Sequence, residues 1–243
     1  MNKKQQGQPT RTRSNKVKIF SCALILVAAV ILGVVIDNAT AGSRFESEIT
    51  AINLAFAKNN TKKIDEVLER TVSSGNYAKV EKSLKKYVRD LTDNINGIDE
   101  VADSDIVYHS LEAEYLGKNK DKLNDTISEL TKASEKVKDL TAAADKLYNE
   151  KEVMVYLEDQ NLNESYKKLF TDNAKVFYGD KELRTNYSDT LKLLRGSVAV
   201  EIEAVTFLNE RKDDWSVENG ELNFKNDNLR KQYIQILEKV AES

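Results

Sequence analysis

His109 is the single histidine of the chain, and two short acidic clusters lie near it. The clusters are "DSD" at residues 103–105 and "EAE" at residues 112–114. Residues three or four apart share one face of a helix, so His109 could approach Asp105 or Glu112 and contact a metal ion. One histidine and one carboxylate do not complete a zinc site, and calcium needs more oxygen ligands from one loop. We therefore expect solvated surface clusters here, with no metal and no cofactor.

Carboxylates alone could still perform general acid–base catalysis. A hydrolase of that kind needs two acids about 5 to 10 Å apart in a cleft. The sequence contains no phosphate-binding glycine loop, no GxSxG, no HExxH and no CxxC. These absences favour a protein that is not an enzyme, with an envelope hydrolase as the least favoured alternative.

Five of the ten tyrosines fall on apolar helical stripes. Aromatic side chains at such positions are typical of a bundle core, with the hydroxyl at the edge of the core. The alternative is a platform of rings that binds a ligand. The five are Tyr77, Tyr87, Tyr148, Tyr187 and Tyr233.

Residues 19–36 form an uncharged run, "IFSCALILVAAVILGVVI", which predicts a transmembrane helix. Eighteen helical residues span roughly 27 Å, enough for the bilayer core. Six basic residues precede the run, so the positive-inside rule places residues 1–18 in the cytoplasm and residues 37–243 outside. The predicted domains are a basic tail (1–18), a signal anchor (19–36) and an extracytoplasmic helical domain (37–243).

Two other interpretations of this segment stay open. Ala39-Thr40-Ala41 has the small-x-small pattern of a signal-peptidase site, which would give a cleaved and secreted form. Cys22 would suit a lipoprotein only if it ended the apolar run, whereas it lies near the start. The whole chain carries −3, so the six positive charges before residue 37 leave −9 for the remainder. An acidic body argues against nucleic acid as a partner.

Apolar residues after position 37 recur at spacings of three and four, which predicts a series of amphipathic helices. The expected helical ranges are 45–56, 64–72, 77–101, 106–116, 123–148, 183–208 and 229–240, with two shorter helices between 150 and 178. Residues 123–148 follow a heptad, but serine and threonine at its core positions favour packing within a bundle over a dimeric coiled coil. The predicted fold is all-α, an elongated antiparallel bundle behind one membrane helix.

One β-hairpin is predicted near residues 214–225, because Asn219-Gly220 is a strong two-residue turn signal. The turn pairs Trp215 with Phe224 and places both on one apolar face, together with Val217 and Leu222. We interpret the hairpin as a connector packed on helix ends, for instance those of 181–210 and 227–241. The alternative is a binding tip in which Trp215 and Phe224 contact a partner.

Three stretches resemble a group of uncharacterised membrane-anchored helical proteins of the Firmicutes. They are "SSGNYAKVEKSLKKYVRDL" (73–91), "VMVYLEDQNLNESYKKLF" (153–170) and "FLNERKDDWSVENGELNF" (207–224). The resemblance implies a Gram-positive cell surface and an extracytoplasmic helical domain. It implies no activity and no functional residue.

The sequence favours a membrane-tethered interaction or scaffold protein of the cell envelope, non-catalytic, with a partner that the sequence does not name. The alternative is a ligand-sensing or solute-binding helical domain that regulates a membrane partner. That alternative requires a cavity among the helices large enough for a small molecule.

Overall fold

The computed structural model of the 243-residue chain describes residues 41–58 and 60–239. The predicted cytoplasmic tail (1–18), the predicted signal anchor (19–36) and nearly all of the candidate cleavage site lie outside these residues. Among the described helices, none combines the length and the apolar character needed to cross a bilayer.

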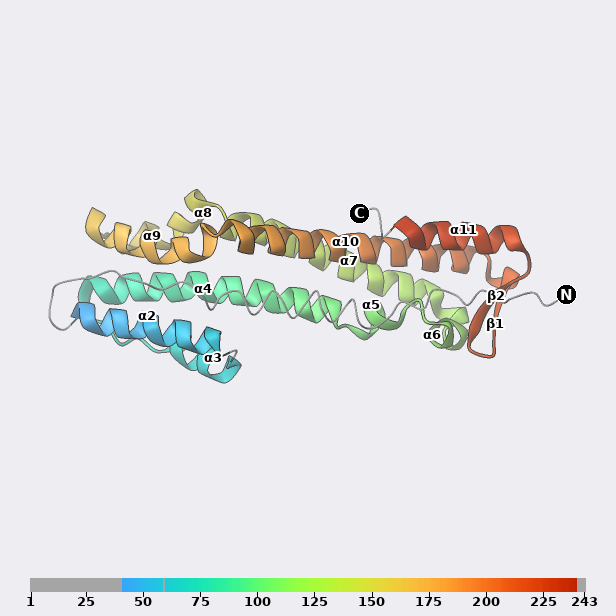
Figure 1. The fold of residues 1–243 in the computed structure, drawn as a ribbon, viewed down its shortest axis with the longest axis horizontal. Coiled ribbons are helices and arrows are strands. Elements are labelled where there is room, and N and C mark those ends of the chain that lie inside the picture. Colours follow the sequence, from blue (N-terminus) through green and yellow to red (C-terminus); the bar gives the residue numbers. More distant parts are fainter. Residues whose placement is uncertain (1–40, 59, 240–243) are drawn as a thin grey trace.

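Three long helices run along an elongated body, two of them in one direction and α7 (Leu123–Leu147) antiparallel to both (Figure 1). The other two are α4 (Gly75–Ala102) and α10 (Lys181–Glu210). Helix α7 lies against both α4 and α10, as its interrupted heptad predicted, so its apolar stripe is used inside the bundle. Leu123, Leu130 and Val137 on that stripe are fully buried.

Shorter helices thicken the bundle at the end where α4 begins (Figure 1). They are α2 (Ala41–Ala57), α3 (Thr61–Glu69), α8 (Glu150–Met154), the 3-10 helix η3 (Val155–Gln160) and α9 (Glu164–Tyr178). Helices α2 and α9 cover α4, and Asn163 caps α9 by accepting a hydrogen bond from the Tyr166 N–H at 3.3 Å.

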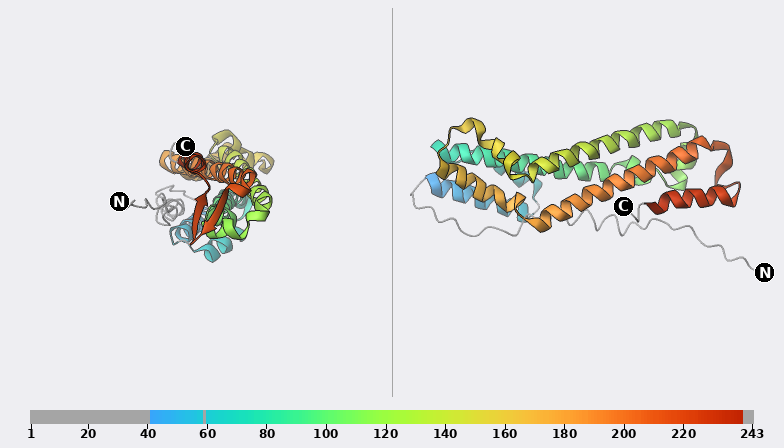
Figure 2. Two further views of the ribbon diagram at one scale, coloured as in Figure 1. Left: turned by 90° about the vertical axis from the view of Figure 1, so that its right-hand side faces the viewer. Right: turned by 90° about the horizontal axis from the view of Figure 1, so that it is seen from above.

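The opposite end holds the hairpin and the last helix (Figure 2, left). Its elements are α5 (Asp105–His109), α6 (Ala113–Lys118), η2 (Lys120–Lys122), η4 (Lys212–Asp214), β1 (Trp215–Glu218), β2 (Glu221–Phe224) and α11 (Asp227–Glu238). The single helix predicted over 106–116 is divided into α5 and α6. Ser110 lies buried at the break, where its hydroxyl donates to the Glu201 carboxylate at 3.4 Å.

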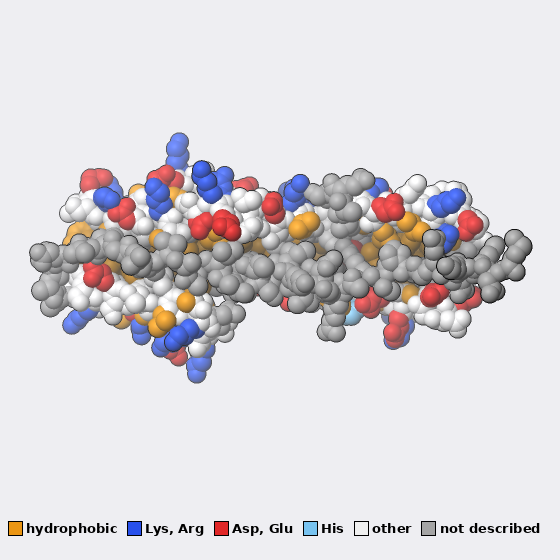
Figure 3. Space-filling view, viewed as in Figure 1, with side chains coloured by type: hydrophobic (Ala, Val, Ile, Leu, Met, Phe, Trp, Pro, Cys, Tyr) orange, Lys and Arg blue, Asp and Glu red, His pale blue; other side chains and the backbone are white. Residues whose placement is uncertain are grey.

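The hairpin has the predicted register. Trp215 pairs with Phe224 and Val217 with Leu222. Asn219 and Gly220 adopt φ angles of 55° and 78°, which the twist of a two-residue hairpin requires. The prediction of an all-α bundle with one small hairpin is therefore confirmed for the described residues. Charges of both signs are distributed over the visible surface of these residues (Figure 3).

Candidate functional site

The histidine and its acidic neighbours form a local surface pair. His109 Nδ1 lies 2.9 Å from Glu112 Oε2, and their side chains are 41% and 53% exposed. Asp105 is in the first turn of α5. Within residues 41–58 and 60–239, no three His, Cys, Asp or Glu side chains are grouped so that they could hold a metal ion.

The hairpin residues pack on neighbouring helices. Trp215 is 3% exposed, and its indole N–H donates to the Leu208 carbonyl at 2.8 Å. Lys120 Nζ lies 4.5 Å from the centre of the indole ring and donates to the Trp215 carbonyl at 2.7 Å. Phe224 is half-buried, with its ring centre 5.4 Å from that of Tyr233 in α11. These contacts join α10, η2 and α11 through the hairpin, as expected of a connector.

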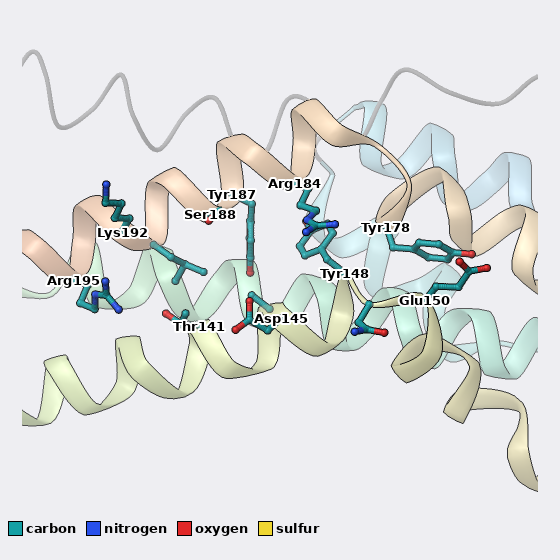
Figure 4. A pocket seen from close by; sticks show the side chains of 13 residues that line it. Thr141, Asp145, Tyr148, Glu150, Tyr178, Arg184, Tyr187, Ser188, Lys192 and Arg195 are labelled. Atoms are coloured by element: carbon teal, nitrogen blue, oxygen red, sulfur yellow. The ribbon is translucent and has the colours of Figure 1, made fainter. Parts of the chain in front are cut away.

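A hollow lies between α7 and α10, near the junctions with α8 and α9 (Figure 4). We call this hollow the α7–α10 groove. Its volume is about 610 Å³, inside the range typical of small-molecule sites. The groove is lined by Thr141, Ala144, Asp145, Tyr148, Asn149, Glu150, Tyr178, Arg184, Tyr187, Ser188, Leu191, Lys192 and Arg195.

Helix ends fix the position of the groove's walls. Asp180 caps α10 by accepting hydrogen bonds from the N–H groups of Glu182 and Leu183 at 2.9 and 3.0 Å. Asn149 caps α8 by accepting from Lys151 N–H at 3.0 Å. From α10, positions 184, 188, 191, 192 and 195 then face the groove, because steps of three and four residues stay on one side of a helix.

The floor of the groove is aromatic, whereas its rim is charged. Tyr148 and Tyr187 are buried, with ring centres 5.3 Å apart. Arg184, Lys192 and Arg195 are exposed on the α10 side, and Asp145 is exposed on the α7 side. A groove of this kind can hold a ligand by apolar contact below and by polar contact at the edges.

The two floor tyrosines differ in their hydroxyl groups. The Tyr187 hydroxyl donates to Asn94 Oδ1, and the Asn94 amide donates to the Leu140 carbonyl at 3.1 Å, which ties α10 to α4 and α7. The Tyr148 hydroxyl has no hydrogen-bond partner among the described residues. Burial raises the pKa of both phenols, and the charge of Asp180 adds to the effect at Tyr148. Both hydroxyls are therefore protonated donors at neutral pH.

Comparison with known proteins does not assign the groove. No family model, no curated protein and no solved structure matches the chain. The resemblance to membrane-anchored Firmicutes proteins therefore stays a prediction, and the function must be argued from the residues themselves.

A second polar cluster is buried among α2, α3 and α4. Lys85 Nζ donates to Glu48 Oε1 at 2.5 Å, to Glu81 Oε1 at 2.8 Å and to the Arg70 carbonyl at 2.8 Å. Arg70 also donates three hydrogen bonds to the Glu48 carboxylate, at 2.6 to 3.1 Å. Glu81 accepts from the backbone N–H groups of Val72 and Ser73. We call Glu48, Arg70, Glu81 and Lys85 the buried ion cluster, in which Arg70 is the exposed member, with its side chain 43% exposed.

The buried ion cluster balances two carboxylates against two cations. Burial by itself raises the pKa of Glu48 and of Glu81, but hydrogen bonds to the charged forms outweigh it. At Glu48 these bonds come from Arg70 and Lys85, and at Glu81 from Lys85 and the backbone. The net pKa of each lies below 4.5. A fully satisfied cluster of this kind fixes how α2 and α3 dock on α4, so its role is structural.

Sequence reasoning did not single out the groove's rim or the buried ion cluster. For Tyr148 and Tyr187 the sequence favours core positions, with a ligand-binding platform as the alternative, and the structure makes them both core and groove floor. A signal for the rim exists in the basic and polar stripe at 184, 188, 192 and 195, next to the apolar stripe of α10. The i, i+4 pair of Glu81 and Lys85 was visible too, but it looks like any surface pair until burial is known.

Proposed function

We propose that this protein is a non-catalytic binding protein of the cell envelope, tethered by residues 19–36, which takes a small ligand in the α7–α10 groove. The observation that supports the proposal is a hollow of about 610 Å³ with a buried aromatic floor and a charged rim. A ligand-sensing domain needs such a cavity, and a bundle without one would have removed this function.

The same groove gives little support to catalysis. Its carboxylates, Asp145 and Glu150, are both exposed at the rim. A catalytic general acid usually gains its raised pKa from burial in an apolar site. The geometry is better suited to holding a ligand than to transforming one, and the absence of enzyme activity stays a prediction.

Occlusion of the groove tests the proposal. Ser188 lies on the rim and is exposed, so Ser188→Trp should fill the groove without disturbing the core. Ser165 in α9 is also exposed and lies outside the groove, so Ser165→Trp is the matched control. Full-length variants in detergent micelles are dialysed to equilibrium against a small-molecule cell extract, and retained compounds are identified by mass spectrometry.

We expect at least one compound to accumulate on the wild type and on Ser165→Trp but not on Ser188→Trp. Equal retention by all three proteins, or no retention by any, would contradict the proposal.

A tethered scaffold for an envelope protein is the second proposal. The observation that favours it is the two-stranded hairpin at one end of the body, since each strand pairs only with the other among the described residues. A strand edge left unpaired can accept a strand from another protein. Crosslinking in native membranes tests this idea, and a uniformly monomeric protein without a crosslinked partner would count against it.

A further inference from the structure

The two walls of the α7–α10 groove carry opposite charges. Arg184 and Arg195 extend from α10 toward α7, whereas the Lys192 side chain is directed away from α7 (Figure 4). Asp145 stands on the facing wall, in α7. Long cationic side chains thus lie on one side of the hollow and a carboxylate on the other.

These opposite charges do not pair across the groove. The side chains of Arg184 and Arg195 make no ion pair or hydrogen bond with another residue in the described part of the chain, and the same holds for the Asp145 side chain. Elsewhere the long helices do form such pairs. Lys136 of α7 lies 2.7 Å from Glu100 of α4. The groove therefore keeps the arginines of α10 apart from Asp145 of α7, and no ion pair joins them.

The α10 wall offers arginine side chains to an anionic group. Arg184 and Arg195 are both exposed and line the groove. Carboxylate oxygens are strong acceptors, and arginine binds them with two parallel hydrogen bonds.

These observations favour one chemical class. A polyanion would meet Asp145 and Glu150 as well as the arginines, and like charges oppose each other. A neutral sugar would leave both sets of rim charges without a counter-charge. A ligand that carries both charges satisfies the two walls at once.

We propose that the groove binds an amphoteric small molecule, an amino acid or short peptide, whose carboxylate lies against Arg184 and whose ammonium group lies against Asp145. The inference rests on the proposed function and specifies the ligand of the same groove. The tyrosine rings beneath accept the apolar part of the ligand.

Blocked and unblocked peptides provide the test. The full-length protein in detergent micelles is screened with a mixture of unblocked tripeptides by saturation-transfer NMR, and the best tripeptide is titrated by calorimetry. The same tripeptide is then titrated in its N-acetylated form and in its C-amidated form. We expect each blocked form to bind at least about tenfold more weakly, because a charge-assisted hydrogen bond is lost.

Variants assign each charge to its wall. Arg184→Ala should weaken binding of the unblocked peptide about tenfold or more but leave the affinity of the C-amidated peptide nearly unchanged. Asp145→Asn should likewise weaken binding of the unblocked peptide about tenfold or more but leave the affinity of the N-acetylated peptide nearly unchanged. Arg44→Ala removes an exposed arginine on α2, far along the sequence from the groove, and should not change affinity. Thermal melts confirm that all variants fold.

The outcomes separate this inference from the proposed function. If the blocked forms bind as well as the unblocked peptide, or no tripeptide binds while Ser188→Trp still loses a compound from the extract, the amphoteric ligand is wrong and groove binding stands. If Ser188→Trp binds the tripeptide like the wild type, both are wrong.

Discussion

Replacement of Lys85 by methionine gives a direct test of the buried ion cluster. Lys85 is 4% exposed and donates to two carboxylates and one carbonyl. Methionine has a similar length and fills similar space, so Lys85→Met removes the charge and the hydrogen bonds and creates little cavity. Glu48 and Glu81 are then left in the protein interior, and the remaining cation of the cluster, Arg70, donates hydrogen bonds to Glu48 alone.

The expected loss of stability depends on the hydrogen bonds that Glu48 and Glu81 keep in the variant. Loss of one partner from a buried ion pair costs about 3–5 kcal/mol. Here Glu48 retains its hydrogen bonds from Arg70, and Glu81 retains two from the backbone. We therefore expect the lower end, a loss of about 3 kcal/mol in the free energy of unfolding, which lowers Tm by roughly 6–12 °C in a domain of this size.

Urea unfolding of the full-length protein, followed by circular dichroism, measures this difference. The control is Lys63→Met, because Lys63 forms an exposed i, i+3 pair with Glu66 at 2.9 Å. Exposed pairs contribute about 0.2–1 kcal/mol, so the control should remain close to the wild type. A Lys85→Met variant as stable as Lys63→Met would refute the view that the cluster holds α2 and α3 on α4.

Three further predictions concern stability. Trp215→Ala should destabilise by about 3–5 kcal/mol in urea unfolding, because it removes a buried ring and its hydrogen bond to Leu208; a nearly unchanged midpoint would favour the binding tip instead. Gly220→Ala should cost about 1–2 kcal/mol, since an L side chain is strained at a φ of 78°, and an unchanged unfolding midpoint would show that the turn relaxes. The pKa values of Glu48 and Glu81 are lower in the folded than in the unfolded state, so their stabilisation is present above pH 4.5 and is lost as the pH falls through the folded values. Urea midpoints measured between pH 6 and pH 3 should fall with pH, more steeply in the wild type than in a Glu81→Gln variant, and equal slopes would contradict the assignment.

Much of the fold could be predicted because helix periodicity and turn chemistry are local. The apolar spacing of 123–148 and 183–208 indicated α7 and α10, and Asn219-Gly220 fixed the hairpin register residue by residue. The break between α5 and α6 was missed, and the buried Ser110 at this break donates a hydrogen bond to Glu201, a residue 91 positions away in the sequence. Contacts of that kind leave no local pattern.

The candidate site was less predictable for the same reason. Tyr148 and Tyr187 were visible as members of apolar stripes, but no spacing tells whether a stripe tyrosine faces a packed neighbour or a hollow. The groove exists because α7 and α10 meet near their junctions with α8 and α9, where the side chains do not fill the space (Figure 4). The opposing positions of Arg184 and Asp145 follow from that packing, and from nothing in either helix alone.

Photo-crosslinking tests most directly the central claim that the α7–α10 groove is the ligand site. An unblocked tripeptide with a benzophenone side chain is irradiated with the full-length protein, and the modified residues are mapped by mass spectrometry. The account predicts adducts within 141–150 and 178–195 that disappear in Ser188→Trp and persist in Ser165→Trp. Adducts concentrated on the hairpin at 215–224, or groove adducts that Ser188→Trp leaves unchanged, would contradict it.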